Sequence, residues 1–275
     1  MDYERLHVHV EDGIGHVVLN KPDEYNRMPP AFWRELPAAI RALDASGEVR
    51  VAIISSTGKH FSAGLDISSF GSDRQRPTDP GRAGEQARRH LEQMQATIST
   101  LEQARMPVIA AIQGGAVGGG VDLAAACDLR YCTKDAFFCI QEINIGLAAD
   151  VGTLQRLPYL IPDGLMRELA YTGRRMYADE AHACGLVSRI FTDAATMMEE
   201  VTRIACTIAA KSPLAIHSTK HLLNYGRAHS VADTLHYQTV WMAAVSQGGE
   251  MARHFEAKAA GTEAVFDDLP PIQDL

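Results

Sequence analysis

The sequence lacks several features that would assign it to a special class of protein. No run of about 18 apolar residues is present that would cross a bilayer. The first residues contain no apolar core of a secretory signal, and the last four, Ile272-Gln273-Asp274-Leu275, do not resemble a peroxisomal signal. The five cysteines form no CxxC pair, which is typical of reduced thiols. We therefore predict a cytoplasmic location.

Strong positive charge and several catalytic motifs are also absent. The formal net charge of −8 disfavours nucleic acid and anionic membranes as partners. The chain has no GxSxG, HExxH or GxxxxGKS/T motif, so the common esterase, zinc-hydrolase and nucleotide-hydrolase signatures are missing. His7 and His9 share a strand face, and His217 and His221 share a helix face, but neither pair has a recognisable third ligand. We therefore predict no metal site.

What is present is the composition of an ordinary globular protein. The chain has 275 residues, of which 46% are hydrophobic and 22% are charged. This length can bury a full core and suits one large domain or a domain with an appendage.

Periodic apolar patterns predict a layered core. Alternating residues at 6–10 and 15–19 around an Asp12-Gly13 turn predict a hairpin. Further strands are predicted at 51–55, 107–112, 129–132 and 137–140, and helices at 31–45, 87–104 and 121–127. Strands that alternate with helices in this way predict an α/β fold.

The pattern changes along the second half of the chain. After about residue 193 it becomes helical, with predicted helices at 194–210, 213–225 and 231–246. We therefore divide the chain into an α/β core, residues 1–192, and a C-terminal helical region, residues 193–275. Residues 68–86 are rich in Gly, Pro, Ser and Asp and predict a surface loop that borders a binding site.

Three carboxylates follow a glycine-rich turn. Gly118-Gly119-Gly120 precedes Asp122, and Glu142 and Asp150 come later. Glycine lets the backbone approach a ligand closely, and the first N–H groups of a helix that begins here lack internal partners. Such N–H groups bind developing negative charge while carboxylates move protons. The combination predicts chemistry that proceeds through an enolate.

Several segments resemble the enoyl-CoA hydratase/isomerase (crotonase) superfamily, and they cover nearly the whole chain in the family's order. They are Phe61-Ser62-Ala63-Gly64-Leu65-Asp66, the strand 107–114, Gly118-Gly119-Gly120, Cys127-Asp128, Leu186-Val187-Ser188 and Lys211-Ser212-Pro213. The resemblance implies a spiral of ββα units, a helical tail used in trimerisation, and commonly a hexamer made of two trimers. It also implies an acyl-CoA thioester substrate and no separate cofactor.

The resemblance further implies where the substrate binds. The backbone N–H groups of Leu65 and Gly119 are expected to form an oxyanion hole for the thioester oxygen, where one such donor contributes roughly 100- to 1000-fold in rate. The substrate and CoA contacts implied by the family are Ser62, Ala63, Gly64, Leu65, Asp66, Gly119 and Arg27.

The chain departs from the family near the nucleotide end of the substrate. Where relatives often carry a basic residue, this sequence has Asp23, Glu24 and Tyr25, which leaves Lys21 and Arg27 as candidates to hold the CoA phosphates. Repulsion from the two acids would weaken CoA binding unless Arg27 or a neighbouring subunit compensates.

The acids point to one subfamily. Hydratases usually have glutamate at the positions of both Asp122 and Glu142 and a small residue at that of Asp150. The spacing of the three acids and the segment 142–158 closely resemble the Δ3,5-Δ2,4-dienoyl-CoA isomerases. The resemblance implies Glu142 as base at C2, Asp150 as acid at C6, and Asp122 as an orienting partner that tunes the pKa of Glu142.

Other interpretations stay open. Asp122 also suits the first turn of a helix, Asp150 a cap of a helix that begins at Val151, and Glu142 a surface loop. With Asp122 and Glu142 alone, the chain would be a 2-enoyl-CoA hydratase or a 3,2-enoyl-CoA isomerase. A non-catalytic, RNA-associating relative is a further alternative, which the acidic net charge disfavours. Asp66 and Asp128 are expected to support the backbone.

Overall fold

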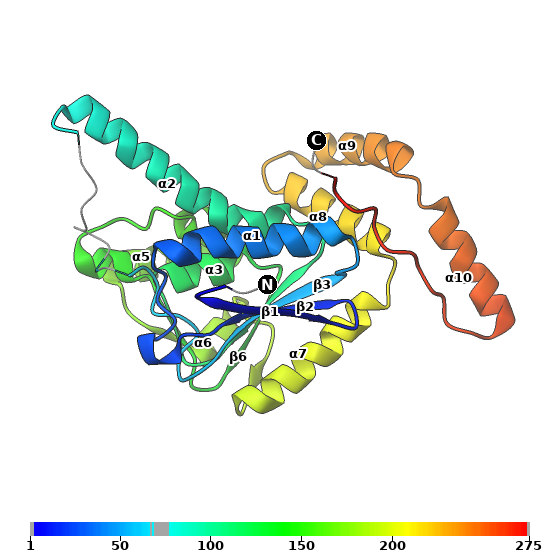
Figure 1. Ribbon diagram of the computed structural model, residues 1–275, viewed down its shortest axis with the longest axis horizontal. Coiled ribbons are helices and arrows are strands. Elements are labelled where there is room, and N and C mark those ends of the chain that lie inside the picture. Colours follow the sequence, from blue (N-terminus) through cyan, green and yellow to red (C-terminus); the bar gives the residue numbers. More distant parts are fainter. Residues whose placement is uncertain (1–2, 67, 69–76, 274–275) are drawn as a thin grey trace.

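The computed structural model describes residues 3–66, 68 and 77–273, and a six-stranded sheet lies at its centre (Figure 1). Strand β1 runs antiparallel to β2, and the other neighbours in the order β1-β2-β3-β4-β6-β9 are parallel. The strands are β1 (Leu6–Glu11), β2 (Ile14–Leu19), β3 (Val51–Ser56), β4 (Val108–Ile112), β6 (Leu129–Thr133) and β9 (Ile190–Phe191). The predicted hairpin and the predicted α/β fold class are confirmed.

A smaller sheet lies beside the first. Its order is β5-β7-β8, with β5 parallel to β7 and β7 antiparallel to β8. The strands are β5 (Gly115–Val117), β7 (Phe137–Cys139) and β8 (Met176–Tyr177). Strand β5 connects the large sheet to the helix that carries the first carboxylate.

Helices cover both faces of the large sheet, and others extend away from it. They are α1 (Pro30–Ser46), α2 (Pro80–Gln103), α3 (Gly119–Ala126), α4 (Thr153–Arg156), α5 (Asp163–Thr172), α6 (Ala178–Ala183), α7 (Ala194–Ala209), α8 (Pro213–Gly226), α9 (Val231–Ala244) and α10 (Gly248–Ala260). Among the described residues, the 3-10 turns are η1 (Pro22–Glu24), η3 (Gln141–Ile145) and η4 (Leu157–Tyr159).

Strand β3 shows why the central strands are continuous apolar runs. Val51 and Ile53 pack with α7, whereas Ala52 and Ile54 pack on the opposite face with α1 and α2. Every residue of β3 is buried, because successive side chains point to opposite faces and both faces are covered.

The predicted boundary between a surface loop and a helix was wrong. Residues 80–86 belong to α2, which begins at Pro80 with the Asp79 side chain accepting the Arg82 N–H at 2.9 Å. This first part of the helix projects away from the sheet (Figure 1) and carries ion pairs between Glu85 and two arginines. It has no apolar stripe, so hydrophobic periodicity did not detect it. Residues 69–76 of the predicted loop lie outside the described residues.

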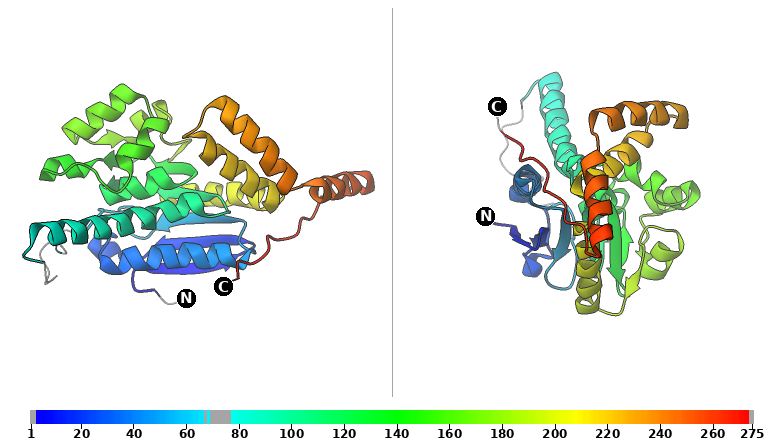
Figure 2. Two further views of the ribbon diagram at one scale, coloured as in Figure 1. Left: turned by 90° about the horizontal axis from the view of Figure 1, so that it is seen from above. Right: turned by 90° about the vertical axis from the view of Figure 1, so that its right-hand side faces the viewer.

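The C-terminal helices have two different roles. Met197, Val201 and Ala205 of α7 are fully buried against the sheet, so this helix completes the core although it follows residue 193. By contrast, α9 and α10 extend away from the sheet (Figure 2) and bury none of their residues. The division of the chain at residue 193 stays a prediction.

The segment after α10 returns to the core. Leu269 N donates to Gly47 O at 3.2 Å and Ile272 N donates to Ala45 O at 2.9 Å, both at the end of α1. Figure 2 shows this segment running back along the body. Among the helices described, none has both the length and the apolar character needed to cross a bilayer.

Candidate active site

The loop after β3 is held against β5 by hydrogen bonds through Ser62. The Ser62 N–H donates to Gly115 O, and Ser62 O accepts the Val117 N–H, both at 3.0 Å. The buried hydroxyl donates to Asn26 O at 2.8 Å and accepts the Gly64 N–H at 3.1 Å. Ser62 therefore shapes the loop that carries the first predicted oxyanion donor.

Two backbone amides come together where this loop meets α3. A Cβ on Gly119 would lie 3.6 Å from Leu65 N, and a Cβ on Gly64, whose φ is +81°, would lie 2.9 Å from Gly119 N and 2.4 Å from Val117 O. Glycine is therefore required at position 64 for this close approach. Within residues 3–66, 68 and 77–273, neither Leu65 N nor Gly119 N donates a hydrogen bond. Both donors are available to a ligand.

Asp122 lies in the first turn of α3 and is 1% exposed. Its Oδ1 atom accepts the Thr153 N–H at 2.6 Å and the Thr153 hydroxyl at 2.7 Å. Its buried Oδ2 atom has no partner among the described residues. Burial raises the pKa of Asp122 to about 6, although the two hydrogen bonds from Thr153 oppose the shift.

Sequence reasoning assigned no role to Thr153. The residue is 1% exposed and fixes one oxygen of Asp122 with two donors, which leaves the other oxygen free to act. Its only signal in the sequence was its place in the segment that resembles the isomerases.

Glu142 lies on the 3-10 turn η3, beside the glycine turn that precedes α3. A Cβ on Gly118, whose φ is +51°, would lie 3.1 Å from Glu142 Oε1. The Oε2 atom is buried and has no partner in the described part of the chain. Burial raises the pKa of Glu142 to about 7. Glu142 thus lies in a surface turn, as one interpretation of the sequence had it, but one of its carboxylate oxygens is buried.

Asp150 is half-buried between η3 and α4. Its backbone carbonyl accepts a hydrogen bond from Gln95 Nε2 on α2 at 2.7 Å. Helix α4 begins at Thr153 with Gly152 as its N-cap, and the Thr153 N–H is accepted by Asp122. The interpretation of Asp150 as the cap of a helix is therefore wrong. Burial raises the pKa of Asp150.

The three carboxylates form one electrostatic group. Burial is the largest cause of the raised pKa in both Asp122 and Glu142. The charge of Asp150 raises both pKa values further, and the charge of Asp122 also raises that of Glu142. Acids with raised and mutually dependent pKa values supply both a proton acceptor and a proton donor near neutral pH. The fold thus brings together the three acids that the sequence placed 20 and 8 residues apart.

One acid of the 23–25 segment, Glu24, is paired with two arginines. Glu24 accepts hydrogen bonds from Arg5 at 3.0 Å and 3.3 Å and from Arg27 at 2.9 Å, and these bonds lower the pKa of Glu24 to about 2. Arg27 is 43% exposed and also lies 3.5 Å from Asp66. Sequence reasoning missed Arg5, which reaches this cluster from the residue before β1. Glu24 therefore repels an anionic ligand less than the sequence indicated.

Two further aspartates support the backbone as predicted. Asp66 Oδ1 accepts the Ser68 N–H at 3.1 Å and its hydroxyl at 2.7 Å. Asp128 Oδ2 accepts the Val108 N–H at 2.7 Å and pairs with the buried Lys220 Nζ at 2.8 Å.

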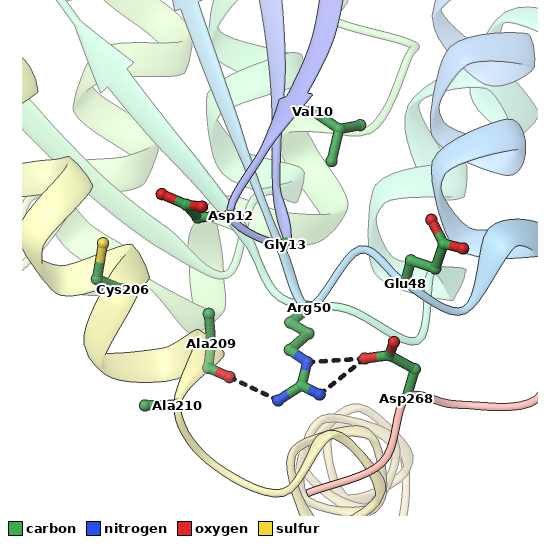
Figure 3. Close-up of a pocket in the computed structure, with 9 residues that line it drawn as sticks. All are labelled: Val10, Asp12, Gly13, Glu48, Arg50, Cys206, Ala209, Ala210 and Asp268. Carbon is green, nitrogen blue, oxygen red and sulfur yellow. Dashed lines mark hydrogen bonds and ion pairs between the residues drawn. The ribbon is translucent and has the colours of Figure 1, made fainter. Parts of the chain in front are cut away.

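A surface hollow near the turn of the hairpin lies apart from the carboxylates, and none of them lines it (Figure 3). The Arg50 guanidinium in this hollow donates to Asp268, to Ala209 O at 3.1 Å and to Phe266 O at 2.6 Å. These bonds tie the returning C-terminal segment to the core. The hollow therefore anchors the chain, and Arg50, the cation among its described lining residues, is already paired.

Comparison with known proteins identifies the family. The model of the enoyl-CoA hydratase/isomerase family matches residues 9–248. A Homo sapiens protein named Delta(3,5)-Delta(2,4)-dienoyl-CoA isomerase, mitochondrial, is 42% identical over 95% of this chain and 81% of its own length. A peroxisomal protein of the same name from Arabidopsis thaliana is 42% identical over 88% of each chain. A crystal structure of an enoyl-CoA hydratase from Bacillus anthracis superposes with a TM-score of 0.86, at 28% identity, over 96% of this chain and 99% of the other.

The names of these relatives overturn the prediction of a cytoplasmic location, since they are described as mitochondrial or peroxisomal. Unpaired cysteines indicate a reducing environment, which does not by itself identify the cytosol. The predicted crotonase fold, by contrast, is confirmed by the structural match along nearly the whole length of both chains. The chain belongs to the enoyl-CoA hydratase/isomerase family.

Proposed function

We propose that this protein is an isomerase that converts a 3,5-dienoyl-CoA into the 2,4-dienoyl isomer. The observation that carries the proposal is the third acid, Asp150, which is electrostatically coupled to Asp122 and Glu142. Relatives that carry the dienoyl-CoA isomerase name at 42% identity support it.

The proton transfer begins at C2. Ionised Glu142 takes a proton from C2, and the electrons of that bond move into the conjugated chain as negative charge develops on the thioester oxygen. With its pKa near 7, Glu142 is ionised in a substantial fraction of molecules at neutral pH, and it is a stronger base than an exposed glutamate.

The transfer ends at C6. Asp150, protonated at the start, gives its proton to C6, which leaves the 2,4-diene conjugated with the thioester. Glu142 then holds the proton taken from C2, and exchange with solvent restores both acids to their starting states. Because C2 and C6 lie several ångströms apart along the conjugated chain, two separate carboxyl groups serve the reaction better than one.

The oxyanion hole consists of the two free amides. The N–H groups of Leu65 and Gly119 hold the thioester oxygen as it gains charge, and each prearranged donor contributes roughly 100- to 1000-fold in rate. Asp122 positions and tunes Glu142, because its Oδ1 is fixed by Thr153 and its Oδ2 is unpartnered within the described residues.

The loop after β3 and the arginine cluster bind the rest of the substrate. The backbone of residues 62–66 contacts the thioester and the adjoining part of CoA. Ser62 and Asp66 hold this loop in its conformation through hydrogen bonds. Arg27 is half-exposed, and we assign it the CoA phosphates.

A second candidate is hydration of a 2-enoyl-CoA or 3,2-enoyl isomerisation, in which Glu142 acts with Asp122. The specific observation in its favour is that Asp122 Oδ2 and Glu142 Oε2 are both buried without a partner in the described residues, an arrangement that one water molecule could bridge. A crotonyl-CoA hydratase from Syntrophomonas wolfei is 32% identical over 82% of the chain.

One experiment separates the two reactions. The purified protein is incubated with a 3,5-dienoyl-CoA and with a 2-enoyl-CoA, and absorbance reports formation of the conjugated diene and addition of water separately. We expect fast diene formation and weak hydration. Dominant hydration without any conjugated diene would refute the isomerase assignment.

We also propose that the protein assembles as a homotrimer or as a hexamer of two trimers. The support is the exposed apolar surface of the two outer helices, where Leu235, Met251 and Phe255 are each about 60% exposed. Light scattering after size exclusion should give three or six times the chain mass of 29.9 kDa. A monomer at micromolar concentration would contradict the proposal.

A further inference from the structure

Three potential metal ligands converge on the β1–β2 hairpin. The register of the hairpin places His9 directly opposite His16, and their rings stack with centroids 4.6 Å apart and planes at 2°. Glu11 lies two residues beyond His9 on the same face of β1, since side chains alternate along a strand. Each of the three offers one ligand atom, and these atoms all lie within 4.8 Å of one another.

The separation of these atoms suits a small transition-metal ion. Ligands at about 2.0–2.1 Å from a tetrahedral Zn²⁺ lie about 3.3 Å apart. The atoms of His9, Glu11 and His16 therefore need to close by no more than roughly 1.5 Å. His9 and Glu11 are exposed on the edge strand, and His16 is partly exposed, so rotation of the side chains accomplishes this without moving the backbone.

We propose that His9, Glu11 and His16 form a surface site for a divalent transition-metal ion, most suitably Zn²⁺. Two imidazoles and one carboxylate are a ligand set that Zn²⁺ accepts, with water filling the fourth position. Such a set disfavours Mg²⁺ and Ca²⁺, which prefer oxygen ligands.

The site explains why sequence analysis predicted no metal. His7 and His9 were considered as neighbours on one strand, where no third ligand was apparent. The second histidine, His16, comes from the pairing of β1 with β2. The carboxylate, Glu11, is the next residue on the same face of β1. The hairpin carries no member of the carboxylate group, so the site is separate from the proposed isomerase chemistry.

The test is a titration of the metal-free full chain with Zn²⁺ alone. Binding is measured by calorimetry and by competition with a chromophoric chelator. We expect one Zn²⁺ per chain. His9→Ala and His16→Ala should each weaken Zn²⁺ binding at least 10-fold. Loss of a residue that only hydrogen-bonds to a metal ligand already lowers metal affinity 10- to 100-fold, and loss of the ligand itself should lower it at least as much. Glu11→Gln should weaken binding by a smaller factor.

The matched control is His236→Ala, which removes an exposed histidine on α9. This variant should bind Zn²⁺ as the parent does. Zn²⁺ should also raise the melting temperature of the parent by mass action, and it should raise that of His9→Ala less at the same Zn²⁺ concentration. Absence of stoichiometric binding, or equal binding by the parent and His9→Ala, would overturn the proposal. Retained diene isomerisation in His9→Ala would show that the variant is folded.

Discussion

Replacing Asp122 with asparagine should remove a pH-dependent destabilisation of the native protein. Asp122 is 1% exposed, and burial raises its pKa to about 6 from 3.8. Between these two values the folded state binds more protons than the unfolded state. The free energy of unfolding of the parent therefore falls as pH rises through this window, and the contribution of Asp122 is constant outside it.

The magnitude follows from the size of the shift. A difference of about two pKa units corresponds to about 3 kcal/mol. Asparagine keeps an oxygen that can accept both hydrogen bonds from Thr153, so the variant retains this contact and loses the titration of residue 122 together with its charge effect on Glu142. The free energy of unfolding of the variant minus that of the parent should therefore rise by about 3 kcal/mol between about pH 3 and about pH 8.

Urea unfolding, followed by circular dichroism at one protein concentration and several pH values, measures this difference. The control is Asp23→Asn, which replaces an exposed aspartate and reports the pH dependence of the rest of the protein. A difference for Asp122→Asn that changes by less than about 1 kcal/mol across the window would refute the reasoning that burial raises the pKa of this carboxyl.

Three further predictions concern the oxyanion hole, the two other acids and the core. Gly119→Val should reduce diene isomerisation at least roughly 100-fold, because its side chain enters the thioester site. The control, Gly164→Val, should stay active, because nothing lies within 4 Å of a Cβ at that position. An active Gly119→Val enzyme would exclude Gly119 from the oxyanion hole. Asp150→Asn should lose at least roughly 100-fold in isomerisation yet still exchange the C2 proton in deuterated solvent. Glu142→Gln should lose that exchange, which mass spectrometry would detect. If Asp150→Asn isomerises the diene as the parent does, the hydratase or enoyl isomerase assignment would be favoured instead. Lys220→Met should lower the free energy of unfolding by about 3 kcal/mol, because Asp128 loses its ion pair and keeps only the Val108 N–H, and two carbonyl oxygens lose their buried donor. Unchanged urea unfolding would contradict this.

The elements with a strong local pattern were predictable from the sequence. The hairpin has alternating apolar residues around Asp12-Gly13, and β3 and β4 are short apolar runs, so each was located to within a residue or two. Helix α1 was found in the same way, because its apolar residues recur at helical spacing.

Elements held by capping or ion pairs were less accessible. The first part of α2 has an Asp79 cap and pairs between Glu85 and arginines, and neither produces an apolar stripe. The place of α7 in the core was also hidden, because an amphipathic helix does not reveal which surface will cover it. The sheet that receives it is assembled from strands far apart in the chain.

The sequence by itself determined the types of residue at the site: two glycine segments, three acids, and a family resemblance that linked them. Only the tertiary structure decided their environment. The pKa of Glu142 rises because the fold buries it and brings Asp122 and Asp150 near, and no local pattern encodes that proximity. The same holds for His9 and His16, which meet because antiparallel pairing sets residues opposite each other, whereas periodicity along one strand relates only residues on that strand.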